Sequence, residues 1–282
     1  MIDLHTHTTA SDGRCTAAEL VARAAAAGVR VLAVTDHDTV ASCREAGEAC
    51  AAAGIEFVAG IEVTAVRDDT DVHTLGYFLD LDSPTLAAFL GEQRRHRIAR
   101  VRQMIDRLAS FGVMLDGDAI LRPACDDPST SAGRPWIARA LVAAGHVTSV
   151  NEAFDRWLAG GRPAFVPRLA ATPEQVIGRV HEAGGIASIA HPGLLKRDEW
   201  LPSLVEAGLD AIEAYHTDHD AAATSRYLAM AATLGVAVSG GSDYHGDSHH
   251  GGRTIGDVSL PREAYERLKA RRPRPAPRTR SA

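Results

Sequence analysis

The sequence has no apolar run near the roughly 20 residues that a membrane-spanning helix needs, and its first residues lack a basic segment followed by an apolar one. We therefore expect no membrane association and a cytoplasmic location. Only four cysteines occur among 282 residues, none in a Cys-x-x-Cys pair, which excludes a disulfide framework and favours reduced thiols. The formal net charge of −6 argues against stable binding of duplex nucleic acid.

Several recurrent functional signals are also missing. No repeat with a fixed period is visible, so a solenoid is not expected. No serine nucleophile elbow occurs, and the glycine-rich stretch GGSDYHGDSHHGG lacks the lysine of a phosphate-binding P-loop. These absences exclude serine-based covalent catalysis and P-loop nucleotide chemistry.

The chain does contain short apolar runs that alternate with helical patterns, which predicts βα units around a mainly parallel sheet. We expect strands in MIDLH, VRVLAVTD, IEFVAGIEV, DVHTLGYFL, GIASIAHP, LDAIEAYH and GVAVSGGSD. Two intervening helices have clear end signals. One begins after Thr16, with Glu19 completing a capping box, and ends at Gly28; the other begins with Thr172 and Pro173.

The region from about residue 83 to residue 168 departs from this alternation, because its patterns are mostly helical. It predicts a helical insertion, or cap, between two strands of a barrel. We expect a discontinuous barrel domain over 1–82 and 169–270, the cap over 83–168, and a disordered, basic and proline-rich tail over 271–282.

Histidines and acids gather at the ends of the predicted strands. Because the C-terminal ends of parallel barrel strands meet at one face, these side chains are expected to converge there. His5 and His7 are separated by one residue, as are Asp243 and His245, so each pair points to one side of an extended chain. Further candidates are Asp36, His37, Glu62, His73, His191, Glu213 and His216.

Imidazole and carboxylate ligands without thiolate suit zinc, manganese or iron. Several carboxylates among the candidates favour more than one divalent ion, since a carboxylate can bridge two ions and offset their repulsion. The sequence therefore predicts a metal site of more than one ion at the end of the barrel.

Arginines in the predicted cap offer cations for a phosphate. Arg94, Arg97 and Arg100 form one stripe of a helix, and Arg134 precedes Pro135 at a helix start, where free N–H groups also attract anions. A stripe of this kind is usually solvated surface. Its position in a segment that can cover the metal face favours substrate binding instead.

The motifs DLHTHTTASDG, AVTDHDT, GIEVT, VHTLGY, IAHPG and GSDYHG, in this order, resemble those of the PHP (polymerase and histidinol phosphatase) family. The resemblance implies an α/β fold, a distorted seven-stranded (β/α)7 TIM-like barrel. Within the family, RIARVRQM and GRPWIARAL in the cap are most similar to phosphoesterases that act on nucleoside 3′,5′-bisphosphates or on the 5′ ends of short RNA. One departure is Trp136, where relatives commonly have histidine.

The resemblance also implies two or three divalent ions, with Mn²⁺ expected and Zn²⁺ or Fe²⁺ as alternatives. It places one ion between His5, His7, Glu62 and Asp243, a second between Asp12, His37 and His245, and a third between Glu62, His73 and His191. We expect His37, Asp243, His245 and His219 to be catalytic. We expect Arg97, Arg100, Gln103, Arg134 and His219 to bind the substrate.

The predicted reaction is hydrolysis of a phosphomonoester of a small nucleotide or short oligonucleotide by metal-activated hydroxide, with the 3′-phosphate of a nucleoside 3′,5′-bisphosphate as the preferred target. AMP, histidinol phosphate and short RNA attacked from its 5′ end are alternative substrates. A metal-binding module without turnover is an alternative of another class.

Overall fold

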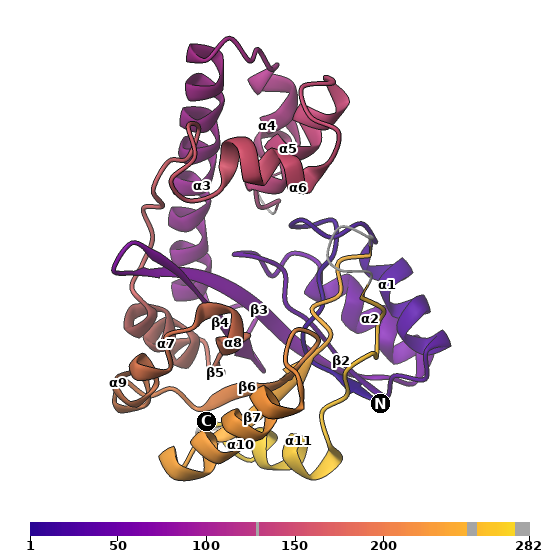
Figure 1. Cartoon of the computed structure of the whole chain (residues 1–282). Helices are drawn as coiled ribbons and strands as arrows, with labels where there is room; N and C mark the ends of the chain where they lie inside the picture. The colour runs from indigo at the N-terminus through magenta and orange to yellow at the C-terminus, as the bar shows by residue number, and fades with distance from the viewer. Residues whose placement is uncertain (128–129, 247–252, 274–282) are drawn as a thin grey trace, which may run out of the picture.

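The computed structural model describes residues 1–127, 130–246 and 253–273. The chain forms one seven-stranded sheet in which the strands lie in sequence order. They are β1 (Ile2–Asp3), β2 (Val31–Val34), β3 (Glu56–Arg67), β4 (Thr70–Tyr77), β5 (Ile186–Ile189), β6 (Ala211–His216) and β7 (Ala237–Gly241). Each predicted strand segment overlaps one of them, although β3 and β4 extend beyond their predicted segments to Arg67 and Thr70. The sheet curls into a barrel surrounded by helices (Figure 1), so the predicted α/β barrel is confirmed.

One strand runs against the others. β1 to β3 are parallel and so are β5 to β7, whereas β4 is antiparallel to both of its neighbours. The reversal occurs at Asp68 and Asp69, whose φ angles of 49° and 57° are those of a two-residue hairpin turn. The expectation that every strand delivers its C-terminal end to the functional face is therefore wrong for β4, which delivers its N-terminal half.

The first and last strands meet and nearly close the barrel. Thr6 and Tyr244 form a parallel bridge, and the Leu4 N–H donates a hydrogen bond of 3.2 Å to the Gly240 carbonyl. A Cβ atom at Gly241 would lie 2.3 Å from the His5 nitrogen, so only glycine allows this approach. The two chain segments that carry the predicted ligand pairs are thus neighbours.

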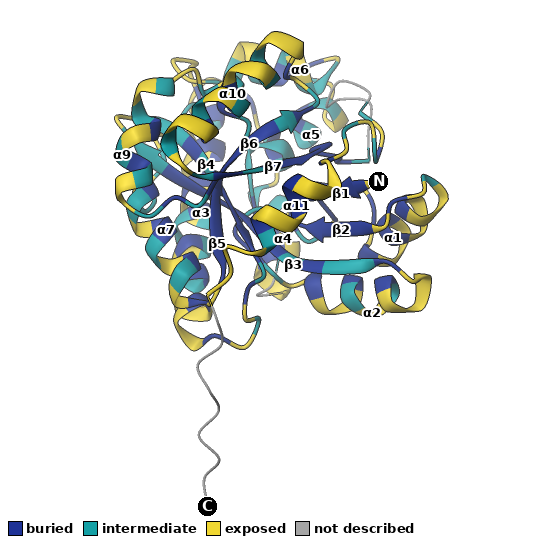
Figure 2. Ribbon diagram, turned by 90° about the horizontal axis from the view of Figure 1, so that it is seen from below, coloured by how far each residue is buried: buried dark blue, intermediate teal, exposed yellow. Residues whose placement is uncertain are grey.

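Helices cover the outside of the barrel, and their outer faces are exposed while the strands are buried (Figure 2). The predicted capping box of Thr16 and Glu19 is present, and a second one forms at the predicted helix start, between Thr172 and Gln175. Within the described ranges, no helix combines the length and apolar character needed to cross a bilayer. The barrel helices are α1 (Ala17–Ala26), α2 (Cys43–Ala53), α7 (Pro173–Glu182), α8 (Pro192–Leu195), α9 (Leu201–Glu206), α10 (Ala221–Leu234) and α11 (Arg262–Lys269).

A separate group of helices stands over one end of the barrel (Figure 1). It comprises α3 (Pro84–Ser110), α4 (Gly117–Asp126), α5 (Arg134–Ala143), α6 (Val150–Ala153) and a π-helix (Phe154–Leu158). These helices lie in the predicted cap and have a hydrophobic core of their own, which includes Met104, Leu108, Leu121, Ile137 and Leu141. The exact domain limits stay a prediction, and residues 274–282 of the predicted tail lie outside the described residues.

Candidate metal centre

Glu62, a buried residue in the middle of β3, lies at the centre of a cluster of histidines. Its Oε2 atom is 3.3 Å from Nε2 of His5, 3.2 Å from Nε2 of His7 and 3.2 Å from Nδ1 of His37. Asp243 joins this group from the end of β7, with Oδ1 3.4 Å from Nε2 of His5 and 3.2 Å from Nε2 of His7. Side chains from β3 and from the segments that follow β1, β2 and β7 thus meet at one point.

The other oxygen of Glu62 faces a different pair of histidines. Oε1 lies 2.7 Å from Nδ1 of His73 and 3.1 Å from Nε2 of His191. His73 reaches this position because β4 is antiparallel, which brings its N-terminal half to the C-terminal ends of the other strands. In the register Thr64 faces His73, so Glu62 and His73 are diagonal neighbours on one face of the sheet.

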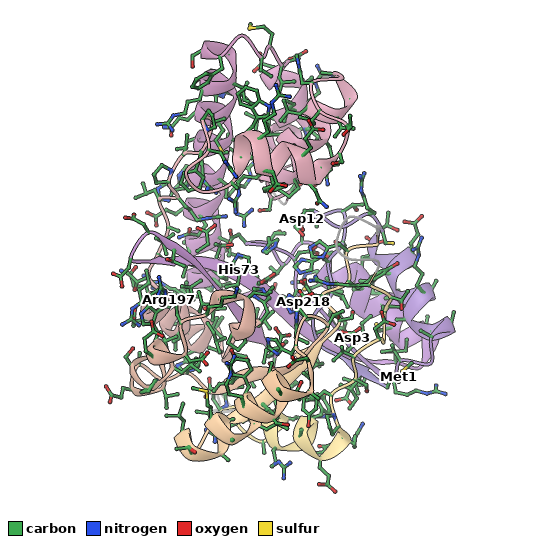
Figure 3. All side chains as sticks on the ribbon, in the orientation of Figure 1. Met1, Asp3, Asp12, His73, Arg197 and Asp218 are labelled. Carbon is green, nitrogen blue, oxygen red and sulfur yellow. The ribbon has the colours of Figure 1, made fainter. Side chains whose placement is uncertain are left out.

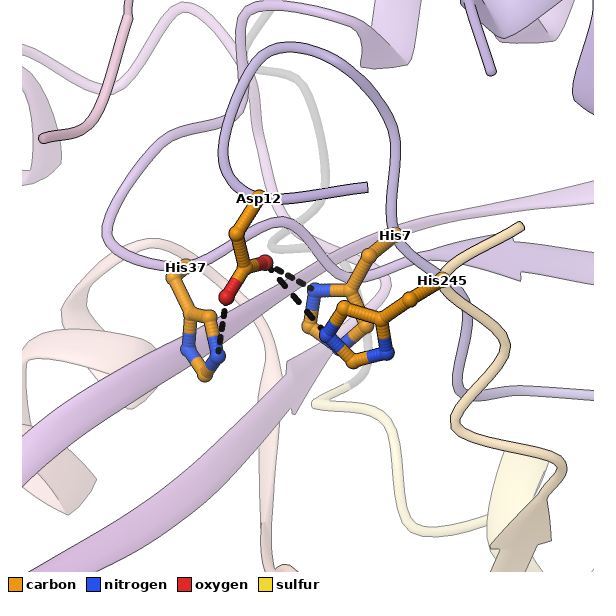
Figure 4. A group of neighbouring side chains, drawn as sticks. All are labelled: His7, Asp12, His37 and His245. Carbon is orange, nitrogen blue, oxygen red and sulfur yellow. Dashed lines mark ion pairs between the residues drawn. The ribbon is translucent and has the colours of Figure 1, made fainter. Parts of the chain in front are cut away.

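Asp12 forms a second group in the loop after β1, between the barrel and the cap (Figure 3). Its carboxylate lies 3.4 Å from Nε2 of His245, 3.8 Å from Nδ1 of His7 and 3.8 Å from Nε2 of His37 (Figure 4). The cap supports this loop, since the Trp136 indole N–H donates a hydrogen bond of 3.3 Å to the Ser11 carbonyl. Asp12 is therefore held from both sides.

The charges of the cluster depend on one another. Burial by itself would raise the pKa of Glu62, but the imidazoles of His37 and His73 hold it well below its ordinary value. Burial by itself would lower the pKa of His7, because it disfavours the charged ring, but the carboxylates of Asp243 and Glu62 outweigh this effect and raise the pKa to about 10. The carboxylates of Glu62 and Asp243 are thus ionised and favour a proton on the His7 ring. His37 differs, because burial lowers its pKa well below the ordinary value.

Unpaired ring nitrogens indicate that the cluster fits metal ions. Within the described part of the chain, both ring nitrogens of His7 and Nδ1 of His37 are buried and have no hydrogen-bond partner. Buried polar atoms are normally hydrogen-bonded, so these atoms are free to act as ligands. His7 and His37 also offer different nitrogens to Asp12 and to Glu62.

Among the residues that the structure describes, ligand atoms within 4.8 Å of one another form four groups: His7, Asp12, His37 and His245; His5, His7, Glu62 and Asp243; His5, Glu213 and His216; and His37, Glu62 and His73. The family resemblance placed His7 with His5, Glu62 and Asp243, whereas the structure brings it to Asp12 as well. An all-nitrogen-and-oxygen donor set at these distances suits divalent transition-metal ions.

Two arginines lie beside this cluster, above the N-terminal half of β4. Nη2 of Arg134 is 3.4 Å from Oδ2 of Asp71, and Nε of Arg168 is 3.4 Å from Oδ1 of the same carboxylate. Asp71 and His73 share a face of β4 because they are two residues apart. The guanidinium groups are therefore held next to the metal-ligand candidates.

Two more arginines come from α3. Arg97 pairs with Asp38 and donates a hydrogen bond of 3.1 Å to the Ala132 carbonyl. Arg100 donates through Nε to the Val166 carbonyl at 2.8 Å, while its Nη2 is buried and has no hydrogen-bond partner among the described residues. The four residues Arg97, Arg100, Arg134 and Arg168 are called the guanidinium cluster below.

Crowding within the guanidinium cluster is unfavourable for its charges. Burial lowers the pKa of Arg100 to about 9, assisted by the positive charges of Arg168 and Arg134. Burial also lowers the pKa of Arg168 to about 10. Four guanidinium groups that share two carboxylates, Asp38 and Asp71, leave an excess of positive charge. Such a surface binds anions.

The structure separates the other predicted substrate residues from this cluster. Gln103 is exposed on α3, whereas Arg97 and Arg100 are buried. Arg94, on the predicted stripe, donates to the Ala124 carbonyl inside the cap. The predicted arginine stripe is thus partly structural.

The ring of His219 is held by backbone groups on both of its nitrogens. Its Nδ1 lies 3.0 Å from the Ala214 carbonyl, and its Nε2 accepts a hydrogen bond of 3.1 Å from the Gly193 N–H. Burial lowers the pKa of the ring, which keeps it neutral. Because both nitrogens are engaged with the backbone, His219 has no atom left for a phosphate or for proton donation, and we leave it out of the proposed chemistry.

Arg168 and Asp71 were missed by the sequence reasoning. The position of Asp71 indicates that its side chain lies beside the candidate ligand His73, since it precedes His73 by two residues in the same strand. Arg168 had no comparable signal in the sequence, because it lies after the last helix of the cap and reaches Asp71 only through the fold. Arg253 was also missed; it pairs with Asp243 and Asp218.

Comparisons with known proteins agree with this geometry. The PHP domain matches residues 3–123. The chain is 36% identical to a 3′,5′-nucleoside bisphosphate phosphatase of Chromobacterium violaceum over 98% of its own length and 99% of the relative. It is 34% identical to the 5′-3′ exoribonuclease Rnm of Escherichia coli, over 86% of this chain and 84% of that one.

A solved structure from Bifidobacterium adolescentis, assigned as a metal-dependent phosphoesterase, superposes with a TM-score of 0.88 at 32% identity and covers 96% of both chains. Similarity of this extent to enzymes, together with the His, Asp and Glu cluster of this chain, sets aside a module without turnover. The chain belongs to the PHP domain family and is a metal-dependent phosphoesterase.

Proposed function

We propose that the protein removes the 3′-phosphate of a nucleoside 3′,5′-bisphosphate. The observation that carries this proposal is the guanidinium cluster beside the metal-ligand candidates. A substrate with two phosphates can place one at the metal centre and the other against Arg134 and Arg168, which share the single carboxylate of Asp71. The chromobacterial relative, named for this activity, supports the same substrate.

The ions would be held by the residues that the sequence named. His5, His7, Glu62 and Asp243 would hold one, Asp12, His37 and His245 a second, and Glu62 with His73 and His191 a third. When bound, such ions neutralise the charge of a phosphate and lower the pKa of water. We propose Mn²⁺ as the native ion, and Zn²⁺ or Fe²⁺ as the alternatives that the same donor set accepts.

The protein's own residues position the reactants. Arg100 has a buried Nη2 without a partner, and it gains a charge-assisted hydrogen bond when an anion enters the guanidinium cluster. The rings of His37 and His245 hold the Asp12 carboxylate between them, at the end of the barrel where the 3′-phosphate would bind. Holding the second phosphate fixes the distance from the substrate's 3′ end to the metal centre, which lowers the entropic part of the barrier.

A substrate panel tests the proposal. Purified protein loaded with Mn²⁺ is given adenosine 3′,5′-bisphosphate, AMP, histidinol phosphate and a 5′-phosphorylated trinucleotide, and phosphate or nucleotide release is followed. We expect the highest kcat/KM for the bisphosphate. A higher value for AMP or histidinol phosphate would contradict the role of the second phosphate. Metal-free protein reconstituted with Zn²⁺ or Fe²⁺ in parallel identifies the most effective ion.

Short RNA attacked from its 5′ end is the second candidate substrate, favoured by the 34% identity to the exoribonuclease of E. coli. If kcat/KM is higher for the trinucleotide than for the bisphosphate, attack on the 5′ end of short RNA replaces removal of the 3′-phosphate as the proposed function. Weak binding of duplex nucleic acid and a cytoplasmic location stay predictions from the sequence.

A further inference from the structure

Strand β6 contains an irregularity next to the metal centre. Glu213 pairs with Ser239 of β7, but Tyr215 pairs with the very next residue, Gly240, so the strand bulges between them. In a regular strand, residues three positions apart point to opposite faces. The bulge instead turns both Glu213 and His216 toward the barrel interior, where they are 0% and 2% exposed.

Glu213 uses both carboxylate oxygens on residues of the metal centre. Oε1 lies 2.9 Å from Nδ1 of His5. Oε2 accepts a hydrogen bond of 2.6 Å from the backbone N–H of His191. His191 has φ 28° and ψ 57°, a left-handed conformation that is costly for a non-glycine residue. The Glu213 carboxylate therefore holds the ring of His5 and the strained backbone of His191.

We propose that Glu213 is a positioning residue of the metal centre, which orients the His5 ring and the His191 backbone on either side of Glu62. This inference rests on the proposed function, in which His5 and His191 bind metal. Accepting the Nδ1 proton of His5 leaves Nε2 to face Glu62 and Asp243, as the distances of 3.3 and 3.4 Å require. A carboxylate in this position also makes the ligating nitrogen more basic.

His216 lies beside Asp243. Its Nδ1 accepts a hydrogen bond of 3.1 Å from the Asp218 N–H, and its Nε2 lies 3.5 Å from Oδ2 of Asp243 without a hydrogen-bond partner among the described residues. The bulge in β6 thus brings both Glu213 and His216 to residues of other strands, but only Glu213 is hydrogen-bonded to them. Glu213 is the better test of the arrangement because it contacts two ligand residues.

The chain contains a matched control at the other end of the same strand. Asp210, just before β6, accepts from Nε2 of His181 at 2.8 Å and from the Ala187 N–H at 2.9 Å. It therefore joins a histidine ring and a backbone N–H as Glu213 does, but away from the metal centre. Comparing Glu213→Gln with Asp210→Asn separates an effect on the metal centre from a general loss of carboxylate hydrogen bonds.

The first measurement is calorimetric titration of each metal-free protein with Zn²⁺. We expect Glu213→Gln to bind Zn²⁺ about 10- to 100-fold more weakly than wild type, with the wild-type number of ions at saturation, and Asp210→Asn to bind as wild type does. Equal affinities in the two variants would overturn the inference. Loss of one ion at saturation would also overturn it, because Glu213 would then be a ligand itself.

The second measurement does not require a folded Glu213→Gln protein. Nitrogen-proton NMR of the Zn²⁺-loaded wild type detects the ring protons of histidine, and the His5 signal is assigned by its loss in His5→Gln. We expect a hydrogen-bonded proton on Nδ1 of His5, and a proton on Nε2 would overturn the inference. Wild-type protein that binds no Zn²⁺ contradicts the proposed metal centre instead, so the two failures are distinguishable.

Discussion

Nδ1 of His73 lies 2.7 Å from Oε1 of Glu62, and the two residues reach each other across adjacent antiparallel strands. This contact is one of five between Glu62 and histidine rings. A carboxylate with this many ring contacts links the His5 and His7 side of the metal centre to the His73 and His191 side. Replacing Glu62 is therefore expected to have consequences that differ from those of replacing any single histidine.

Glu62→Gln is expected to lower kcat/KM by more than about 100-fold, the upper range for residues that only support a metal ligand. The amide is uncharged and can no longer offset neighbouring cations, so the variant also retains fewer ions after dialysis, measured by elemental analysis. Glu56→Gln is the control. Glu56 begins the same strand but pairs with Lys269 and Tyr265 outside the metal centre. Similar losses in both variants would contradict the central role of Glu62.

Metal uptake is expected to release protons and to strengthen as the pH rises. The pKa of His7 is raised to about 10 in the metal-free protein, so the ring is protonated at neutral pH and must lose a proton before a nitrogen can bind an ion. Below that pKa, affinity increases about tenfold per pH unit for each proton displaced. Titration with Mn²⁺ between pH 6 and pH 8 in a weak buffer containing an indicator measures both effects. An affinity independent of pH would show that the rings are already neutral.

Arg134→Ala and Arg168→Ala are each expected to raise KM for adenosine 3′,5′-bisphosphate by about 10- to 100-fold, the value of a hydrogen bond to a charged group. A monoester without a second phosphate should change by less than about threefold. Arg162→Ala, an exposed arginine of the same connecting segment, serves as the control. Equal effects on both substrates would remove the assignment of a second phosphate to the guanidinium cluster.

Trp136→Phe keeps an aromatic ring but removes the N–H that donates to the Ser11 carbonyl beside Asp12. Loss of one neutral hydrogen bond predicts a fall in kcat/KM of about three- to tenfold. Trp157→Phe is the matched change, because Trp157 packs against Phe111 within the cap, with ring centroids 6.1 Å apart. If both variants behave alike in a kinetic assay, the cap does not support the Asp12 loop through this contact.

The sequence predicted those parts of the centre that depend on local geometry. The spacing of His5 and His7 was sufficient because both follow one strand and lie on one side of it. Asp243 and His245 also come together, but Asp243 has a left-handed φ of 53°, so the argument from an extended chain does not explain their positions. His73 does lie in the cluster, but the argument that placed it there was incomplete, since its position depends on the reversal of β4 at Asp68. A turn formed by two aspartates is a weak hairpin signal compared with Asn-Gly or Asp-Gly.

Other features depend on contacts between distant segments. The inward direction of both Glu213 and His216 requires a bulge, and the residue spacing alone predicts opposite faces. The environment of His219 depends on Gly193, where a Cβ atom would lie 2.7 Å from the imidazole ring. Arg168 reaches Asp71 only after the cap has returned to the barrel. No local pattern in the chain contains this information.

Because the first and last strands meet, the metal centre combines residues that are synthesised early with residues that are synthesised late. During synthesis His5 and His7 leave the ribosome early, but Asp243 and His245, their neighbours in the folded barrel, are among the later residues. A chain that stops short of β7 lacks Asp243 and His245, which are ligand candidates for two of the three proposed ions. Such a chain does not carry the complete centre.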